Sequence, residues 1–394
     1  MKSTKNLLVL LAVALAACGG DGAATTTAGS TETTEATGTT SAETTETTAG
    51  TETTAAPEVT TGELIPIRLQ LQWVTQAQFA GYFAAIEQGF YNDAGLDVAI
   101  LEGAVDIVPQ QVVAAGGAEF GLAWVPKALV SREEGADIVN IGQVFQRSGT
   151  LEVSWADSGI TEPAHWDGKR VGTWGFGNEF ELFAAFEKFD VTPSEIIQQP
   201  FDMSLLLNNE LDAAQAMTYN EYAQVLEQEN PETGELYTPE DLAVIDFNEI
   251  GTAMLQDAVW VDAAWLADNE ETAQAFLKAS FQGWIFCRDN PDACVQTVLD
   301  RGSALGASHQ AWQMNEINAL IWPSPGGIGV MDQALWDQTV EVAVSESVIT
   351  ADPGPDAYRS DLAEAAVAEL EAEGLEVTGD GFQKTTVTLN PGGE

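Results

Sequence analysis

The chain has 394 residues, of which 61 are acidic, 14 are basic and 2 are histidines, giving a formal net charge of −47 at pH 7. This charge excludes nucleic acid as a partner, because contacts to phosphates need lysine and arginine side chains that the chain lacks. We interpret most of the charge as a general acidic surface, which favours a neutral or cationic ligand over an anion.

The first 18 residues have the pattern of an export signal. Lys2 and Lys5 precede an apolar run over residues 7–14, and a small-residue cleavage site ends in Cys18. The run is too short to cross a bilayer of about 30 Å. The pattern predicts a bacterial lipobox in which Cys18 carries lipid and holds the chain on the outer face of the cytoplasmic membrane. An ordinary secretory signal with an incidental Cys18 is the alternative.

Residues 19–61 are mostly Thr, Ala, Gly and Glu, with almost no large apolar side chain. Such a composition cannot bury a core, so it predicts a disordered spacer between the anchor and a folded part.

The segment 62–150 alternates strands with helices. Strands are predicted at 67–73, 96–101, 120–124 and 138–145, and helices at 79–90, 107–115 and 126–134. Repeated strand–helix units predict a parallel sheet with helices on both faces, and ligands collect at the carboxyl ends of such strands.

A second set of units follows, with strands at 169–174, 196–200 and 213–218 and helices at 179–189 and 203–209. Residues 243–249 and 258–261 read as extended returns, and residues 270–286 and 333–344 as helices. The pattern predicts an α/β clamshell of two lobes with parallel-rich sheets, joined by two crossings. Its lobe 1 spans 62–150 and 250–345, and its lobe 2 spans 151–249.

The last part, residues 346–394, contains a predicted helix at 358–373 and a predicted strand at 385–389. We expect it to pack as an appendage on lobe 1.

Cys287 and Cys294 are separated by six residues that include Pro291. A turn between two helical stretches would bring them together, and an oxidising compartment would allow a disulfide. Two buried thiols are the alternative. A metal site is not expected, because His165 and His309 are far away in sequence and form no ligand spacing.

Three runs, taken in order, carry a family resemblance: Leu71-Gln72-Trp73 with Phe79-Ala80-Gly81-Tyr82, then Gly89-Phe90-Tyr91-Asn92-Asp93-Ala94-Gly95-Leu96-Asp97-Val98, then Gly117-Ala118-Glu119-Phe120-Gly121. The chain resembles solute-binding proteins of the thiamine-pyrimidine (hydroxymethylpyrimidine) branch, which are related to sulfonate and nitrate binders. The resemblance implies a type II periplasmic-binding-protein clamshell that serves an ABC importer. It also implies a permease and an ATPase as partner subunits.

The same branch includes the thiamine pyrimidine synthase, which uses a pyridoxal phosphate lysine, a consumed histidine four residues later and a cysteine-rich iron motif. At the corresponding two positions this chain has Ala123 and Lys127, and it has no cysteine cluster. The chain therefore lacks the groups that the synthase chemistry requires. We expect a binding protein without cofactor and not an enzyme.

The candidate ligand site follows from position at the strand ends. Trp73, Trp124, Trp174 and Tyr219 each lie at or just after the end of a predicted strand, where a cleft would form. Aromatic walls favour a flat ring, and exocyclic amines or ring nitrogens need fixed polar partners. The candidates for that role are Gln78, Asn178, Glu179, Asn220 and Glu221.

Each choice has a plainer alternative. Trp73 and Trp124 are equally consistent with core positions, and Glu179 with an ordinary acid in the first turn of a helix.

The sequence thus predicts a monomeric, lipid-anchored binding component that captures a flat heteroaromatic nutrient and delivers it to a permease. A thiamine-pathway aminopyrimidine is the first choice and riboflavin the alternative. Sulfonate or nitrate fits less well, since the chain carries so little positive charge.

Overall fold

The computed structural model describes residues 63–394, which belong to one compact unit, Thr61–Glu394. The predicted signal segment, Cys18 and the predicted spacer lie outside the described residues. Among residues 63–394, no helix combines the length and the apolar character that crossing a membrane would require.

The larger region of the unit is organised by a five-stranded sheet in the order β2-β1-β3-β10-β4. Its strands are β1 Ile65–Gln70, β2 Leu96–Leu101, β3 Phe120–Trp124, β4 Ile138–Gln143 and β10 Asp257–Asp262. The pairs β1–β2 and β1–β3 are parallel, whereas β10 runs antiparallel to both β3 and β4. Every residue of β3 is buried, as expected for a strand with both sheet faces covered.

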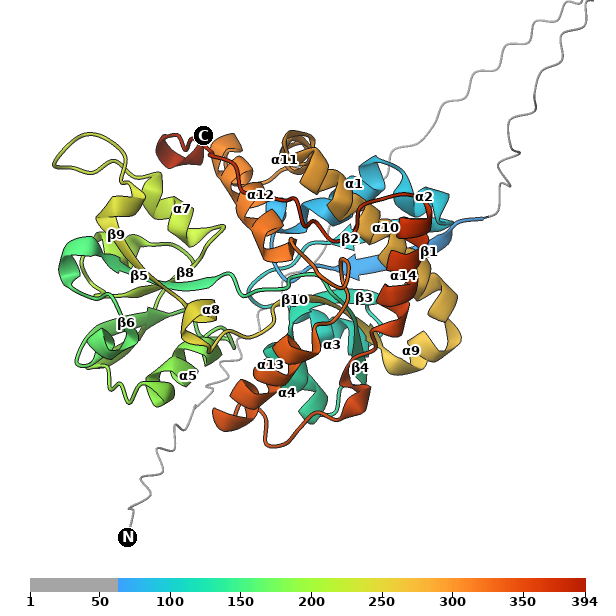
Figure 1. Ribbon diagram of the computed structural model, residues 1–394, viewed down its shortest axis with the longest axis horizontal. Coiled ribbons are helices and arrows are strands. Elements are labelled where there is room, and N and C mark those ends of the chain that lie inside the picture. Colours follow the sequence, from blue (N-terminus) through green and yellow to red (C-terminus); the bar gives the residue numbers. More distant parts are fainter. Residues whose placement is uncertain (1–62) are drawn as a thin grey trace, which may run out of the picture. The chain divides into compact units, whose positions relative to one another are not determined.

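Helices cover both faces of this sheet (Figure 1). The core on one face contains buried side chains from α1 Ala80–Glu87, α2 Phe90–Asp93, α10 Glu270–Asp289, α11 Pro291–Asp300, α12 Ala307–Ile321 and α14 Asp361–Ala372. The other face packs against α3 Pro109–Ala114, α4 Val125–Glu133 and α13 Gln333–Ser345. The short α9 Ala263–Asp268 follows β10 directly. The three layers agree with the α/β class predicted from the sequence.

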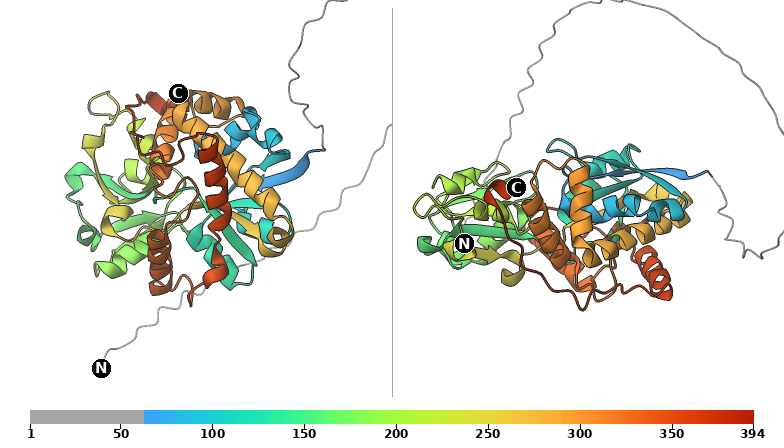
Figure 2. Two further views of the ribbon diagram at one scale, coloured as in Figure 1. Left: turned by 45° about the vertical axis from the view of Figure 1, so that its right-hand side comes forward. Right: turned by 90° about the horizontal axis from the view of Figure 1, so that it is seen from above.

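The smaller region holds two further sheets. Its strands are β5 Thr150–Trp155, β6 Arg170–Thr173, β7 Glu195–Gln198, β8 Ala214–Met217 and β9 Leu242–Asp246, and its helices are α5 Phe180–Lys188, α6 Ser204–Leu207, α7 Glu221–Leu226 and α8 Phe247–Ile250. Strand β5 pairs antiparallel with β8 and β9, and β6 pairs in parallel with β7. In both views of Figure 2 this region, green to yellow, stays at one end of the unit.

Several sequence-based expectations need correction here. The smaller region is not parallel-rich, because its three-stranded sheet is antiparallel. The extended return at 243–249 ends at Asp246, whose side chain accepts a hydrogen bond from Asn248 N and starts α8. The pattern also missed α12, whose buried face carries polar side chains such as Gln310 and Gln313 and so hides the helical periodicity.

The carboxyl-terminal segment also differs from the prediction, because residues 385–389 form no strand. Asn315 on α12 takes the place of a partner strand: its Oδ1 accepts from Thr385 N at 2.9 Å, and its Nδ2 donates to Thr385 O at 3.1 Å. A side chain thus satisfies the backbone groups that a sheet would pair. The segment ends in the turn Pro391–Gly393, where Gly392 N donates to Glu227 O at 3.0 Å, next to α7 of the smaller region.

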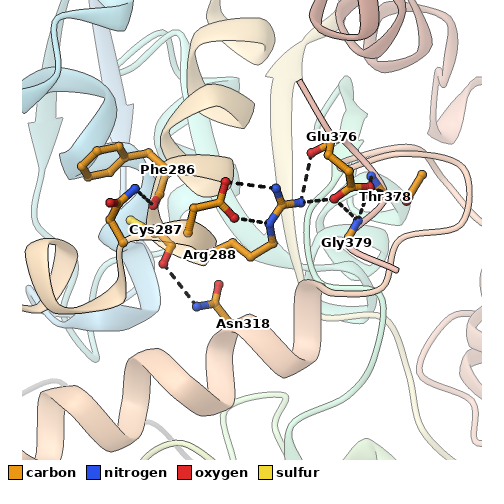
Figure 3. A network of polar contacts seen from close by, with 9 residues as sticks. Phe286, Cys287, Arg288, Asn318, Glu376, Thr378 and Gly379 are labelled. Atoms are coloured by element: carbon orange, nitrogen blue, oxygen red, sulfur yellow. Dashed lines mark hydrogen bonds and ion pairs between the residues drawn. The ribbon is translucent and has the colours of Figure 1, made fainter. Parts of the chain in front are cut away.

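Cys287 near the end of α10 and Cys294 in α11 form a disulfide, with 5.5 Å between their Cα atoms. The adjacent Arg288 holds the stretch of chain that follows α14, as Figure 3 shows. Its guanidinium donates to Glu376 Oε2 at 2.6 Å and to Asp289 Oδ1 at 2.8 Å, and it lies over the Trp322 ring. The segment after α14 is therefore tied to the helix pair that carries the disulfide.

Candidate ligand site

A cavity of about 420 Å³ opens between the carboxyl ends of the strands in the larger region and the loops of the smaller region. Trp73 comes three residues after β1, Trp124 is the last residue of β3, Trp174 directly follows β6, and Tyr219 follows β8 by two residues. All four line the cavity. Its volume falls within the range of roughly 300 to 1,000 Å³ that is usual for small-molecule sites.

Eight of the nine ligand-site residues proposed from the sequence line this cavity. They are Trp73, Gln78, Trp124, Trp174, Asn178, Tyr219, Asn220 and Glu221. Glu179 does not line it. Its carboxylate accepts a hydrogen bond from Gly177 N at 2.9 Å and so supports the loop before α5.

Phe201 completes an aromatic wall that the sequence reasoning missed. Its ring lies 4.8 Å from that of Trp73, tilted by 50°, and 6.2 Å from that of Trp174, nearly parallel at 12°. It therefore sits beside an aromatic residue of each region, and it lines the cavity itself. Phe201 follows the short strand β7, and nothing in its local sequence distinguishes it from a core phenylalanine.

Asp257, the first residue of β10, organises the floor of the site. Its carboxylate accepts hydrogen bonds from Trp124 Nε1 at 2.9 Å and Gln78 Nε2 at 2.9 Å, and also from Gln72 Nε2. Burial raises the pKa of Asp257 to about 6, against these hydrogen bonds and the positive charge of Lys127, which lower it. One buried carboxylate thus holds three side chains that face the ligand space, and the sequence alone did not single it out.

Lys127, in the first turn of α4, is the one basic residue among the described residues that line the cavity. Its Nζ donates to Asn178 Oδ1 at 2.7 Å and lies 4.8 Å from the centre of the Trp124 ring. Burial lowers the pKa of Lys127 to about 8, although Glu179 and Asp257 oppose that shift. The site therefore offers one ammonium donor, held by an amide and an aromatic face.

A line of buried polar side chains leads away from the other side of the cavity. Asn220 Nδ2 donates to Glu221 Oε1 at 2.8 Å, and His309 lies between Asn220 Oδ1 at 3.0 Å and Glu227 Oε1 at 2.7 Å. Burial raises the pKa of Glu221. Since His309 belongs to α12 and the other three to the smaller region, this line connects the two regions beside the site.

The two chain crossings between the regions meet at another buried acid, Glu181 of α5. Its Oε1 accepts from Met254 N at 2.6 Å in one crossing, and its Oε2 accepts from Ser148 Oγ at 3.1 Å in the other. Burial raises the pKa of Glu181 to about 7, because these hydrogen bonds only partly compensate for the loss of water. No pattern in the sequence points to this role.

The positions that correspond to the lysine and the histidine of the synthase are both at the cavity, where Ala123 and Lys127 line it. Among residues 63–394, no three His, Cys, Asp or Glu side chains gather in a way that would hold a metal ion. The arrangement is suited to stacking a flat ring and bonding its edge.

Comparison with known proteins gives the family. The family model described as NMT1/THI5 like matches residues 76–294, which is more than half of the chain. The chain belongs to the NMT1/THI5-like family. The resemblance inferred from the sequence runs is thereby confirmed.

Three curated relatives indicate what this NMT1/THI5-like chain is similar to. The formylaminopyrimidine-binding protein of Halalkalibacterium halodurans is 23% identical over 282 residues, covering 70% of this chain and 83% of that protein. The riboflavin-binding protein RibY of Chloroflexus aurantiacus is 23% identical over 304 residues, covering 72% and 82%. A 4-amino-5-hydroxymethyl-2-methylpyrimidine phosphate synthase of Aspergillus parasiticus is 20% identical over 242 residues, covering 59% and 70%.

Among solved structures, the periplasmic sulfonate-binding protein SsuA of Methylobacillus flagellatus matches with a TM-score of 0.55 at 14% identity, covering 83% of this chain and 99% of that one. At this identity the match concerns the fold. It confirms the periplasmic-binding-protein fold predicted for this NMT1/THI5-like chain.

Proposed function

We propose that the chain is the extracytoplasmic substrate-binding component of an ABC importer, and that its ligand is a thiamine-pathway aminopyrimidine. The observation that carries the proposal is the convergence of Trp73, Trp124, Trp174 and Phe201 on one cavity between two α/β regions. A flat ring stacked against such a wall gains roughly 0.5–1.5 kcal/mol per aromatic pair beyond the burial of area. The relative that binds formylaminopyrimidine supports this choice.

The polar groups of the cavity suit the edge of an aminopyrimidine. Glu221 and the side-chain oxygens of Gln78 and Asn220 offer acceptors for an exocyclic amine, and Lys127 offers a donor for a ring nitrogen. A single base is a poor match for a sulfonate or nitrate, which needs several donors to replace its water.

Riboflavin is the second candidate, and the length of the cavity favours it. The cavity is lined by Lys127, Val130 and Ser131 of α4 and by Glu134, which caps the end of this helix. Their i, i+3, i+4, i+7 spacing places them along one side of the helix. Seven residues of helix rise about 10 Å. The ring and the long polar side chain of riboflavin would fill this part of the cavity, whereas a small pyrimidine would leave it filled with water. The relative RibY supports this alternative.

In this proposal the two regions act as lobes, residues 62–150 with 250–345 and residues 151–249, and residues 346–394 are an appendage. The lobes close on the ligand because the closed state binds it better than the open one. A permease with its ATPase then takes the ligand from the closed form, while lipid on Cys18 keeps a monomeric chain at the outer face of the membrane. We propose that the protein performs no catalysis.

Ligand binding by the purified segment 62–394 tests the proposal. We would record its absorption spectrum, then measure thermal shifts and calorimetric affinities for 4-amino-5-hydroxymethyl-2-methylpyrimidine, thiamine, riboflavin, taurine and nitrate. Tight binding of the aminopyrimidine supports the first candidate. A yellow protein, or binding of riboflavin alone, replaces it with the second. Binding of taurine or nitrate alone would contradict both.

A further inference from the structure

The loop between β6 and α5 holds an aromatic side chain in an unfavourable position. Gly175, Phe176 and Gly177 have φ values of 72°, 56° and 83°, so three successive residues lie in the left-handed region. Glycine adopts this region freely, but a bulky aromatic residue rarely does and is strained there. Such strain persists only where the surrounding structure holds it, and it is concentrated at binding and switch segments.

The Phe176 side chain is also poorly buried. It is 62% exposed, and among the described residues no other large apolar side chain is more exposed. Both the backbone strain and the exposed ring oppose stability of the fold, and a glycine or an asparagine at this position would avoid them. The fold alone gives no reason for a phenylalanine here.

The flanks of the loop are firmly held, which keeps the ring at the mouth of the cavity. Asn178 N and Nδ2 both donate to Gly175 O, at 3.0 and 2.7 Å, and Asn178 Oδ1 accepts from Lys127 Nζ. Gly177 N donates to Glu179 Oε2. The side chain that this framework presents lines the cavity itself.

A second exposed apolar residue lines the cavity from the other region. Val105, in the loop after β2, is 49% exposed. Its loop is fixed to the first strand's loop by Gly103 N, which donates to Trp73 O at 2.9 Å. Single exposed apolar residues are common on protein surfaces. Phe176 and Val105 differ in that each lies at the cavity, one in each region.

We propose that Phe176 is an aromatic lid. When the two regions approach one another over a flat ligand, its ring leaves water, covers the ligand and contacts the loop that carries Val105. The inference rests on the proposed function, since it requires a heteroaromatic ligand. It assigns Phe176 as a specificity residue: a flat ring gives the lid a surface to cover, and a small tetrahedral anion does not.

The test uses the segment 62–394 with two variants, Phe176→Gly and Phe176→Ala, and two probes, riboflavin and 4-amino-5-hydroxymethyl-2-methylpyrimidine. Both variants remove the ring, so we expect each to weaken binding of the preferred probe at least about 10-fold, mainly through faster dissociation. Only glycine also relieves the backbone, so ligand-free Phe176→Gly should unfold at a higher temperature than Phe176→Ala. Phe183→Ala is the matched control, because Phe183 is exposed on α5 and does not line the cavity.

The possible outcomes distinguish a failure of the lid proposal from a failure of the proposed function. If the wild type binds a probe and both Phe176 variants bind it equally well, the lid is wrong and the proposed function stands. A ligand-free Phe176→Gly variant that is less stable than Phe176→Ala would also overturn the lid, because the ring position would then be relaxed. If the wild type binds neither probe, the proposed function fails and the lid fails with it.

Discussion

The indole Nε1 of Trp124 donates a hydrogen bond to Asp257 Oδ1 at 2.9 Å, joining the end of β3 to the start of the antiparallel strand β10. The same carboxylate accepts a hydrogen bond from Gln78 Nε2 at 2.9 Å. The aromatic and the polar parts of the candidate site therefore depend on one buried acid that does not itself line the cavity.

Replacing Asp257 by Asn should weaken ligand binding about 10-fold. An amide would present its own donors to Trp124 or Gln78, and hydrogen bonds to a charged group contribute about 1.5–3 kcal/mol. Calorimetry with the best ligand of the panel measures the effect. The control is Asp262→Asn at the other end of β10, where the side chain caps α9 and asparagine caps equally well. Equal losses in both variants would contradict a specific role for Asp257.

Lys127 should make ligand affinity depend on pH. Since burial lowers its pKa to about 8, the ammonium is lost as pH rises from 7 to 9, and affinity should fall over this range. Lys127→Met should bind about 10-fold more weakly at pH 7 and show a flat profile, as expected for the loss of one charged donor. Titrations at several pH values measure this. Lys188→Met, an exposed change on α5, should keep the wild-type profile. A flat wild-type profile would rule out contact between Lys127 and the ligand.

The aromatic wall should account for much of the affinity. We expect Trp73→Ala and Trp174→Ala each to weaken binding about 10-fold or more, through lost stacking and lost apolar burial. Phe201→Ala should weaken it similarly, because Phe201 packs against both indoles. Trp155→Ala serves as the control, since Trp155 packs on Tyr237 away from the cavity. Unchanged affinity in Trp73→Ala and Trp174→Ala would end the stacking hypothesis.

Glu181 should make the protein more stable in mild acid. Burial raises its pKa from the ordinary 4.5 to about 7, so between these pH values the folded state holds a proton that the unfolded chain has released. The free energy of unfolding then falls as pH rises through this window, by about 3 kcal/mol for this group. Glu181→Gln should remove that part of the slope in urea unfolding curves at pH 5 to 8. Glu187→Gln, exposed on the same helix, should leave the slope unchanged.

The disulfide should contribute about 2–3 kcal/mol to stability, the amount expected for closing a loop between residues seven apart. The double variant Cys287→Ser, Cys294→Ser should therefore unfold at lower urea concentration, and a reductant should act on the wild type in the same direction. Ligand affinity should not change, because neither residue lines the cavity. If reductant does not change the urea concentration at which the wild type unfolds, the prediction is wrong.

The strand ends of the site were predictable because their positions follow from chain order alone. Parallel strands bring their carboxyl ends to one edge, so Trp73 and Trp124 could be placed without knowing a single contact. Asp257 could not be identified in this way, because nothing distinguishes one acid among 61 until its burial is known. Phe201 and Glu181 were missed for the same reason: their roles come from contacts between regions distant in sequence.

Local propensity also misled at the carboxyl end. The alternating residues 385–389 have the composition of a strand, but a strand needs a partner strand with free backbone groups. In the structure the backbone of Thr385 is bonded to the Asn315 side chain instead. Glu179 differs from these residues. It was proposed from the sequence as a ligand-site residue, but its carboxylate accepts a hydrogen bond from Gly177 N in the loop beside the site, and it does not line the cavity.

Strand β10 has a consequence for the order in which the protein is completed. It lies between β3 and β4, so β4 lacks its sheet neighbour until residues 257–262 exist. A chain shortened before that point would leave β3 as an open edge and β4 without a strand partner. It would also lack the carboxylate that holds Trp124. Completing the central sheet and completing the candidate site therefore depend on the same strand, and a fragment that ends before residue 257 would have neither.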